Sequence, residues 1–445
     1  MGSVHVHLTG PRFRAHVESI VEKSREMQED PLEQEVECAR RNDGRRRLKW
    51  LVAISVVLIV GAAAAVGQAV SMHGSQRLAA LALEEQGRTE DAETVWQAIA
   101  KANPSDAEAY AHLGLLQARE QHYNDAIPNY RKALALNPRM PGLRLNLGLA
   151  YFKSGELRLA VSTFEPLLRA APKGSPEALR LTTLIGLADY AAGDYASAVP
   201  YLKRATAADP KNLPFRMMLA HCCLWSKQYQ CVLDVYHEIL TLDPDSAEAD
   251  MLAGEAYDEL NNDSGALEEF AAAVKADPKM PEVHFGYGYL LWKALKFDDA
   301  EKEFRAELAN DAQQPLALAY LGDVEIRQNR PAEALPHLEQ AIRIRPSIPI
   351  AYLDLGTIDD GQGRKDDALR ELKIAESLSP NDPTVHWHLG RLYQSIGQTA
   401  EAKAELKKTQ TLQNAKTESL REQMNQVEPR AGVEQGSGGA VAPSH

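Results

Sequence analysis

The sequence predicts an all-helical protein: a superhelical solenoid of about ten helix-turn-helix repeats, preceded by one transmembrane helix. Three observations lead to this prediction. Proline recurs at a fixed interval, apolar stripes recur with helical spacing, and one long uncharged segment precedes the repeats. A fixed period of this kind indicates stacked supersecondary units, which bury their apolar faces against one another.

The composition narrows the class of protein. Charged residues make up 25% of the 445 residues, which is normal for a folded chain and excludes a wholly disordered one. The hydrophobic fraction is 44% although Phe, Trp and Tyr contribute only 6%, so the apolar content is mostly aliphatic and rich in Ala, the best helix former. The net charge of −13 argues against a nucleic-acid partner, because phosphate binding needs clustered Lys and Arg.

Residues 50–70 form the predicted transmembrane helix. No residue from Trp50 to Val70 is charged, and at about 1.5 Å per residue the segment is long enough for a bilayer core of about 30 Å. The residues just before it are mostly basic: Arg40, Arg41, Arg45, Arg46, Arg47 and Lys49. By the positive-inside rule, residues 1–49 are then a cytoplasmic tail and the repeats lie outside the cytoplasm. We therefore expect a single-pass protein of the inner membrane with its repeats in the periplasm.

Two alternatives for residues 50–70 stay open. The segment is also compatible with a cleaved signal peptide, in which Gly67 and Ala69 supply the small residues before the cleavage site. A buried core helix is the other alternative, although such helices rarely run this long without a polar face. The anchor and the signal peptide both place the residues after 71 outside the cytoplasm.

The repeats are clearest in the prolines, which stand at positions 104, 138, 172, 210, 244, 278, 346 and 380. The interval from Pro278 to Pro346 spans two periods, and the interval from Pro172 to Pro210 holds four extra residues, which we place at 175–178. Each period contains two apolar stripes with helical spacing, separated by a short polar stretch. The period therefore corresponds to a pair of helices joined by a turn.

Small residues recur in both helices of each pair. The first helix carries glycine in eight units, at positions 114, 148, 186, 254, 288, 322, 356 and 390. Twelve residues later the second helix carries alanine, at positions 126, 160, 198, 266, 300, 334, 368 and 402 in the units that have this glycine. Glycine inside a helix costs about 1 kcal/mol relative to alanine. Its return in so many units indicates that the two helices cross at close range.

The array resembles tetratricopeptide repeats, whose pattern is a bulky residue, Leu-Gly, an aromatic, an Ala, an aromatic and a closing Pro. Residues 107–140 show this pattern with Leu113-Gly114, Ala126, Tyr130 and Pro138. We count ten units, at 73–106, 107–140, 141–174, 179–212, 213–246, 247–280, 281–314, 315–348, 349–382 and 383–416. Residues 417–427 are expected to form a polar capping helix. Residues 428–445, rich in Gly, Ser, Ala and Pro, are expected to be disordered.

The resemblance implies a concave wall that is built from the first helices and binds peptide segments or helices of partner proteins. Carried over by register, the wall contains Phe152, Lys153, Tyr190, Met217, His221, Trp225, Met251, Glu255, Asp258, Phe285, Tyr289, Trp292, Tyr320, Trp387 and Arg391. If Trp225, Tyr289 and Trp292 bind a partner, they are partly exposed in the free protein. The acidic wall residues, with Glu259 and Asp323, favour a segment that combines apolar side chains with Lys or Arg.

The sequence contains no sign of catalysis. It lacks a phosphate-binding GxxxxGK[ST] loop, an HExxH zinc helix, a GxSxG nucleophile motif and a dinucleotide-binding GxGxxG. We therefore predict no enzyme activity, no cofactor and no metal. The array also departs from two known subfamilies. Ala111 and Leu115 stand where the chaperone-binding subgroup has Lys and Asn, and Asn146 stands alone where the sugar-transferring subgroup has a ladder of Asn.

The cysteines leave three alternatives open. Cys222, Cys223 and Cys231 fall inside one repeat, and they are inert packed thiols, a disulfide from Cys222 or Cys223 to Cys231, or zinc ligands together with His221. Adjacent helical residues point about 100° apart, so Cys222 and Cys223 are poorly placed to share one tetrahedral zinc site.

Two functions follow from these predictions. The first is a membrane-anchored extracytoplasmic scaffold that binds partner segments in the concave groove of the repeats. The second is a non-catalytic accessory subunit of an envelope enzyme or of an export or assembly machine, for example in polysaccharide export or lipoprotein assembly. Both imply protein partners and a membrane contact through residues 50–70, and both leave self-association open.

Overall fold

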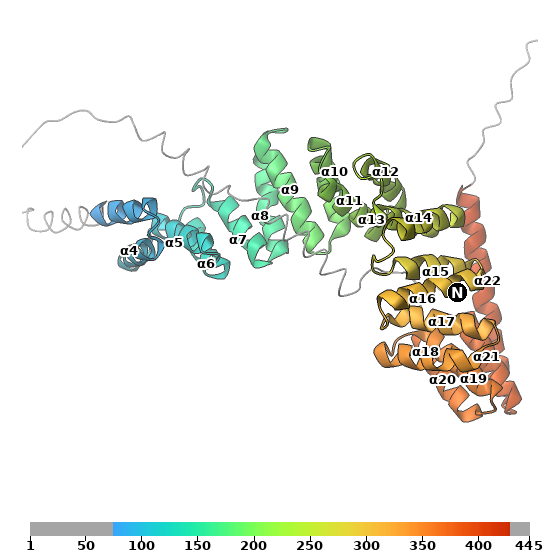
Figure 1. Cartoon of the computed structure of the whole chain (residues 1–445). Helices are drawn as coiled ribbons and strands as arrows, with labels where there is room; N and C mark the ends of the chain where they lie inside the picture. Colours follow the sequence, from blue (N-terminus) through green and yellow to red (C-terminus); the bar gives the residue numbers. More distant parts are fainter. Residues whose placement is uncertain (1–73, 428–445) are drawn as a thin grey trace, which may run out of the picture. The chain divides into compact units, whose positions relative to one another are not determined.

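The computed structural model describes residues 74–427, and over this range every regular element is an α-helix (Figure 1). The predicted tail at 1–49, the predicted transmembrane helix at 50–70 and the predicted disordered segment at 428–445 lie outside the described residues. None of the helices between residues 74 and 427 has both the length and the apolar character needed to cross a bilayer.

The described chain divides into two compact units at residue 267. The first unit contains a helix at 74–85 followed by α4 (Thr89–Ala102), α5 (Ala107–Arg119), α6 (Tyr123–Leu136), α7 (Leu143–Ser154), α8 (Leu157–Ala170), α9 (Pro176–Ala191), α10 (Tyr195–Ala208), α11 (Leu213–Trp225), α12 (Tyr229–Leu240) and α13 (Ala247–Glu259). The division falls within α14 (Asp263–Ala276).

The second unit continues with helices of similar length in the same order. It contains α15 (Val283–Lys293), α16 (Phe297–Asn310), α17 (Pro315–Arg327), α18 (Pro331–Ile344), α19 (Pro349–Gly361), α20 (Lys365–Leu378), α21 (Pro383–Ser395) and α22 (Thr399–Val427). Residues 417–427 are helical, but they continue α22 and do not form the separate capping helix that the sequence analysis expected.

Neighbouring helices pack as pairs, and the pairs stack. Within the second unit α15 contacts α16, α17 contacts α18, α19 contacts α20 and α21 contacts α22. The first helices of successive pairs also contact one another: α15 with α17, α17 with α19 and α19 with α21, and in the first unit α5 with α7 and α11 with α13. First helices of successive repeats therefore lie side by side and form a surface of their own within each unit.

The two helices of a pair meet along a seam of small residues. A Cβ added to Gly322 would lie 2.6 Å from Cδ2 of Leu338, and one added to Gly356 would lie 2.7 Å from Cγ of Leu372 and 3.2 Å from the carbonyl oxygen of Ala368. Ala334 and Ala368 have no exposed surface. The glycine thus lies against a large side chain sixteen residues later and against the backbone of the second helix. Because a larger residue would overpack this space, the seam explains the recurrence of glycine.

The turn inside each pair contains one residue in the left-handed conformation. In the first unit this residue is Gly87, Gln121, Gly155, Gly193, Lys227 or Asn261, and in the second it is Leu295, Asn329, Gly363 or Gly397, with φ between 58° and 86°. Five of these ten residues are not glycine, and a side chain in this conformation is strained.

The four-residue insertion at 175–178 lengthens one helix. Helix α9 has 16 residues, whereas α5 and α11 have 13. Its N-terminus is capped by Ser175, whose hydroxyl accepts a hydrogen bond from the backbone N–H of Ala178 at 3.1 Å, and Pro176 occupies the first turn. The insertion therefore extends this first helix at its start.

Candidate partner-binding faces

We call the surface formed by α5, α7, α9, α11 and α13 the N-terminal face, and the surface formed by α15, α17, α19 and α21 the C-terminal face. The wall residues named from the sequence lie on these helices, with Trp225 at the last position of α11. Most of them are buried: Phe152, Tyr190, Met217, His221, Met251, Phe285, Tyr289, Trp292 and Tyr320. Lys153, Trp225, Glu255 and Asp258 are half-buried, and Trp387 and Arg391 are exposed.

Four aromatic side chains form a cluster in the C-terminal face. The ring centroids of Tyr289, Trp292 and Tyr320 lie 5.0–5.8 Å from one another, and the ring of Phe285 lies 5.9 Å from that of Tyr320. The indole N–H of Trp292 donates a hydrogen bond of 2.5 Å to Oδ2 of Asp323. Side chains of the next repeat, on α17, therefore cover Tyr289 and Trp292.

The burial of this cluster corrects one expectation from the sequence. Tyr289 is 7% exposed and Trp292 is 6% exposed, so the expectation that both are partly exposed in the free protein is wrong. The physical reason is that α17 places Tyr320 and Asp323 against them. In this structure these aromatic residues join two repeats, as core residues do.

The N-terminal face centres on Trp225. Its ring centroid lies 4.3 Å from that of Tyr195 and 5.1 Å from the ring of His221, which it meets edge-on. His221 is buried, and its Nε2 lies 2.9 Å from Oε1 of Glu248 on α13. Trp225 itself is half-buried, as the sequence analysis expected for a residue of the wall.

The last repeat presents the exposed aromatic residue of the C-terminal face. Trp387, on α21, is 40% exposed. The guanidinium carbon of Arg391, one turn later, lies 4.9 Å from the centroid of its ring, which is within the range of a cation–π contact. The neighbouring residue His388 is half-buried, and its Nδ1 lies 3.3 Å from the hydroxyl oxygen of Thr357 on α19.

A group of charged residues lies where α17 meets α19, and the sequence analysis identified only part of it. Nε of Arg327 donates a hydrogen bond of 2.5 Å to Oδ2 of Asp323. Asp354 on α19 is buried, and its Oδ2 has no hydrogen-bond partner. Burial raises the pKa of Asp354 well above its ordinary value, and the charge of Asp323 adds to this effect while Arg327 opposes it.

The repeat period also places Asp354 on the wall. Asp354 follows Tyr320 by one period of the repeat and therefore occupies the wall position of its own repeat. His388 follows Asp354 by the same interval. The three successive repeats thus place an aromatic residue, a carboxylate and an imidazole at one equivalent position. The wall residues named from the sequence include Tyr320 but neither Asp354 nor His388, so this change of chemistry was missed.

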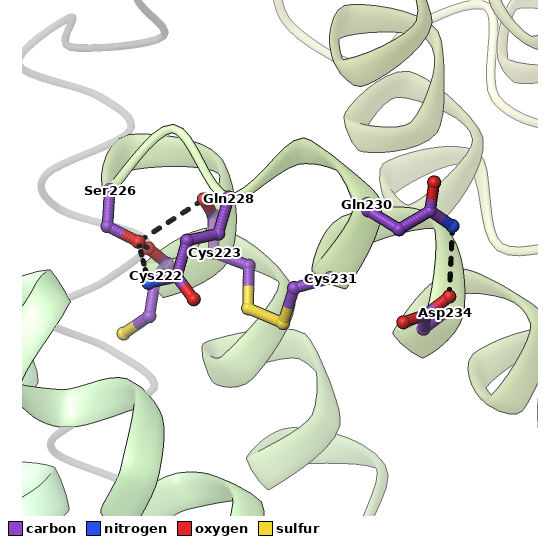
Figure 2. Close-up of a disulfide and its surroundings, with 7 residues drawn as sticks. All are labelled: Cys222, Cys223, Ser226, Gln228, Gln230, Cys231 and Asp234. Carbon is purple, nitrogen blue, oxygen red and sulfur yellow. Dashed lines mark hydrogen bonds between the residues drawn. A yellow bond between two sulfur atoms is a disulfide. The ribbon is translucent and has the colours of Figure 1, made fainter. Parts of the chain in front are cut away.

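The cysteines of α11 and α12 form one disulfide and leave one free thiol. Cys223 on α11 is bonded to Cys231 on α12, with their Cα atoms 5.7 Å apart. Figure 2 shows that the side chain of Cys222 points away from this bond, and Cys222 is a buried free cysteine. Of the three alternatives from the sequence, the structure has the disulfide from Cys223. The sulfurs of Cys223 and Cys231 are therefore not available as thiolate ligands for zinc.

One cluster in the second unit has the ligand types of a metal site. Glu376, His386 and Glu405 place a ligating atom each within 4.8 Å of one another. The ammonium group of Lys408 contacts both carboxylates, at 3.2 and 3.0 Å, and that of Lys373 lies 2.8 Å from Glu376. Cationic groups of the protein thus already balance these carboxylates.

Models of one family match most of the described chain. Three models, each described as a tetratricopeptide repeat, match residues 117–185 and 189–230, residues 77–141, 233–281 and 286–349, and residues 383–415.

Curated and solved relatives share part of the array. Anaphase-promoting complex subunit 3 of Schizosaccharomyces pombe is 24% identical over 181 residues, which are 41% of this chain and 27% of that protein. Cellulose synthase operon protein C of Pseudomonas fluorescens is 30% identical over 169 residues, 37% of this chain and 13% of that protein. The chain spans less than a third of the length of these two relatives. The crystal structure of a tetratricopeptide repeat protein from Parabacteroides merdae is 19% identical and has a TM-score of 0.44, covering 60% of this chain and 97% of that one.

Proposed function

Because the chain belongs to the tetratricopeptide repeat family, we propose that it is a non-catalytic scaffold that binds segments of partner proteins on its first-helix faces. One observation carries this proposal. The C-terminal face exposes 40% of Trp387, in a chain in which aromatic residues make up only 6%. Exposed tryptophan with a neighbouring arginine is typical of the residues that anchor protein interfaces.

Capture of partners by variants of the full chain tests this proposal. Because 40% of Trp387 is exposed, its replacement by alanine should lower the melting temperature less than replacement of the buried Trp292. Capture of its partners from cell extract should fall about tenfold or more, since an aromatic anchor at an interface typically contributes about 2 kcal/mol. Undiminished capture by Trp387→Ala would count against the C-terminal face as the binding surface.

We also propose that the scaffold is anchored in the inner membrane through residues 50–70, with the repeats in the periplasm. The uncharged run from Trp50 to Val70 and the basic residues before it support this topology. The disulfide between Cys223 and Cys231 supports it independently, because disulfides are typical of oxidising compartments and rare in the cytosol.

Reporter fusions test this topology. A reporter that is active only outside the cytoplasm should function after residue 427 and fail near residue 30. The opposite pattern would contradict both the orientation and the localisation. Thiol labelling of protein that is denatured directly from cells is an independent test. Cys223 and Cys231, which are buried in the folded protein, should then react only after a reductant is added.

A second candidate function is an accessory subunit of an envelope enzyme or export machine. The similarity to cellulose synthase operon protein C of Pseudomonas fluorescens favours this candidate, although it covers only 13% of that protein. Crosslinking of the full chain in cells followed by mass spectrometry separates the two. An accessory subunit should yield one envelope enzyme or exporter in stoichiometric amount, whereas a general scaffold should yield several partners.

A further inference from the structure

One carboxylate of the C-terminal face lacks the partner that its burial demands. Asp354 is 5% exposed, and its Oδ2 is a buried atom with no hydrogen-bond partner. Leaving a buried charged acceptor unsatisfied costs free energy, so buried carboxylates are normally paired or hydrogen-bonded. Asp354 lies one helical turn before Thr357 on α19, and the two side chains therefore share one face of this helix.

The positive charge beside Asp354 is already engaged. On α17, Nε of Arg327 donates to Asp323 at 2.5 Å, and the guanidinium carbon lies 5.5 Å from the ring centroid of Trp292. Asp323 also accepts the indole N–H of Trp292. Two carboxylates thus lie beside one guanidinium group, which is bound to Asp323. When both carboxylates are ionised, the excess negative charge resides on Asp354.

The neighbouring helix on the other side provides no cation against Asp354. From α21, His388 lies 3.3 Å from Thr357. Burial lowers the pKa of His388, and the charge of Arg391 lowers it further, so the imidazole is neutral at pH 7. Arg391 lies over the ring of Trp387. Neither α17 nor α21, the two helices that contact α19 along the face, therefore supplies a free cation to balance Asp354.

We propose that Asp354 is the anchor of a subsite for a lysine or arginine side chain of a bound partner segment, with Trp387 contacting an apolar side chain beside it. This inference rests on the proposed function as a scaffold. Charge complementarity supports it, because an ammonium or guanidinium group beside the 5% of Asp354 that is exposed balances the charge of the carboxylate. Hydrogen bonds between charged partners are also about twice as strong as neutral ones.

The placement of Trp387 fits the same occupant. It precedes His388 on α21, and His388 in turn contacts Thr357, one turn after Asp354. The ring of Trp387 and the carboxylate of Asp354 thus flank the contact between His388 on α21 and Thr357 on α19. Long basic side chains have aliphatic stems that pack on apolar surface while the charged end is hydrogen-bonded.

Peptide selection with the full chain tests the inference. A phage library of random twelve-residue peptides is selected in parallel on the original protein, on Asp354→Asn and on Asp366→Asn, a control at an exposed position of α20. We expect peptides selected by the original protein and by Asp366→Asn to share a Lys or Arg at one fixed position beside an apolar residue. Peptides selected by Asp354→Asn should lack this preference, and the same preference in all three selections would overturn the inference.

A double-mutant cycle locates the contact. One selected peptide and its analogue with norleucine in place of the basic residue are titrated against the original protein and Asp354→Asn by fluorescence anisotropy. Each single change should weaken binding about tenfold or more. The two changes together should weaken it no further, because they remove the same contact. If the two losses of affinity multiply, Asp354 does not contact the basic residue of the peptide, and the inference is overturned.

The remaining outcomes are distinguishable. The Asp354→Asn protein should melt no earlier than the original, since the change removes a buried charge without a partner. A lower melting temperature with unchanged peptide affinity would make Asp354 a structural residue and overturn the inference alone. Recovery of no peptide family by the original protein would contradict the proposed function, and the inference with it.

Discussion

The seam inside each helix pair and the first-helix faces differ in how closely one repeat resembles the next. Along the seam, glycine in the first helix and alanine in the second recur with the same geometry, as Gly322 with Ala334 and Gly356 with Ala368 show. On the C-terminal face, one equivalent position holds Tyr320, Asp354 and His388 in three successive repeats. The seam therefore supplies stability, and the face is free to change chemistry.

The largest effect is expected where a face residue has become part of the core. Trp292 is 6% exposed and is covered by the next repeat. Replacing it with alanine should lower the free energy of unfolding by about 3–5 kcal/mol, the usual cost of deleting a buried aromatic side chain. Trp387→Ala, at an exposed position of the same face, should lower it by about 2 kcal/mol or less, because 40% of this side chain is already in water. Urea denaturation of both variants checks this. Equal losses of unfolding free energy in the two variants would show that the face has no exposed anchor.

The seam should be sensitive to a single methyl group. In α19, a Cβ at Gly356 would lie 2.7 Å from Leu372, whereas a Cβ at Gly361 has no neighbour within 4 Å. Gly356→Ala should therefore destabilise the protein by about 1–3 kcal/mol. Gly361→Ala, in the same helix, should be neutral or stabilising by up to about 1 kcal/mol. Thermal denaturation measures both. A stabilising Gly356→Ala would mean that the helices do not cross closely there.

In the turns inside the helix pairs, removing a side chain should stabilise the protein, whereas on the seam adding a side chain destabilises it. Leu295 has a φ of 60° and is 69% exposed, so its side chain contributes strain and little packing. Leu295→Gly should stabilise the protein by about 0.5–1 kcal/mol, after allowance for the greater freedom of glycine in the unfolded chain. Gly363→Ala, at the equivalent turn of another repeat, should destabilise it by about 1 kcal/mol. Melting curves that shift in the same direction for both variants would contradict the assignment of strain.

A further effect, which depends on pH, concerns a buried carboxylate of the first unit. Burial raises the pKa of Asp189 to about 6, and the charges of Asp194 and Glu165 add to this effect. Because the folded state holds this proton more tightly than the unfolded state, stability falls as the pH rises from about 4 to about 6. Asp189→Asn should therefore gain melting temperature relative to the original protein across this range. The exposed Asp245→Asn should show no such change, and a gain independent of pH would exclude a titration of Asp189.

The seam was predictable from the sequence because its requirements are local. Glycine at 114 and alanine at 126 lie twelve residues apart in one helix pair. A close crossing of the two helices explains why position 114 has no side chain. Burial on the faces depends on which side chain the next repeat supplies. The period placed Trp292 and Trp387 on the same face but did not show that Tyr320 covers Trp292. The pairing of Cys223 with Cys231 was likewise one of three alternatives until the turn brought their Cα atoms to 5.7 Å.

The measurement that tests the central claim most directly is site-specific photo-crosslinking in living cells. The photoreactive amino acid benzoylphenylalanine replaces Trp387 on the C-terminal face or Arg370 on α20, both of which are exposed. If first-helix faces bind partner segments, position 387 should yield a discrete crosslinked adduct with a partner protein, and position 370 should yield none. Adducts from position 370 without adducts from position 387 would show that the partner binds the second helices, and would contradict the account.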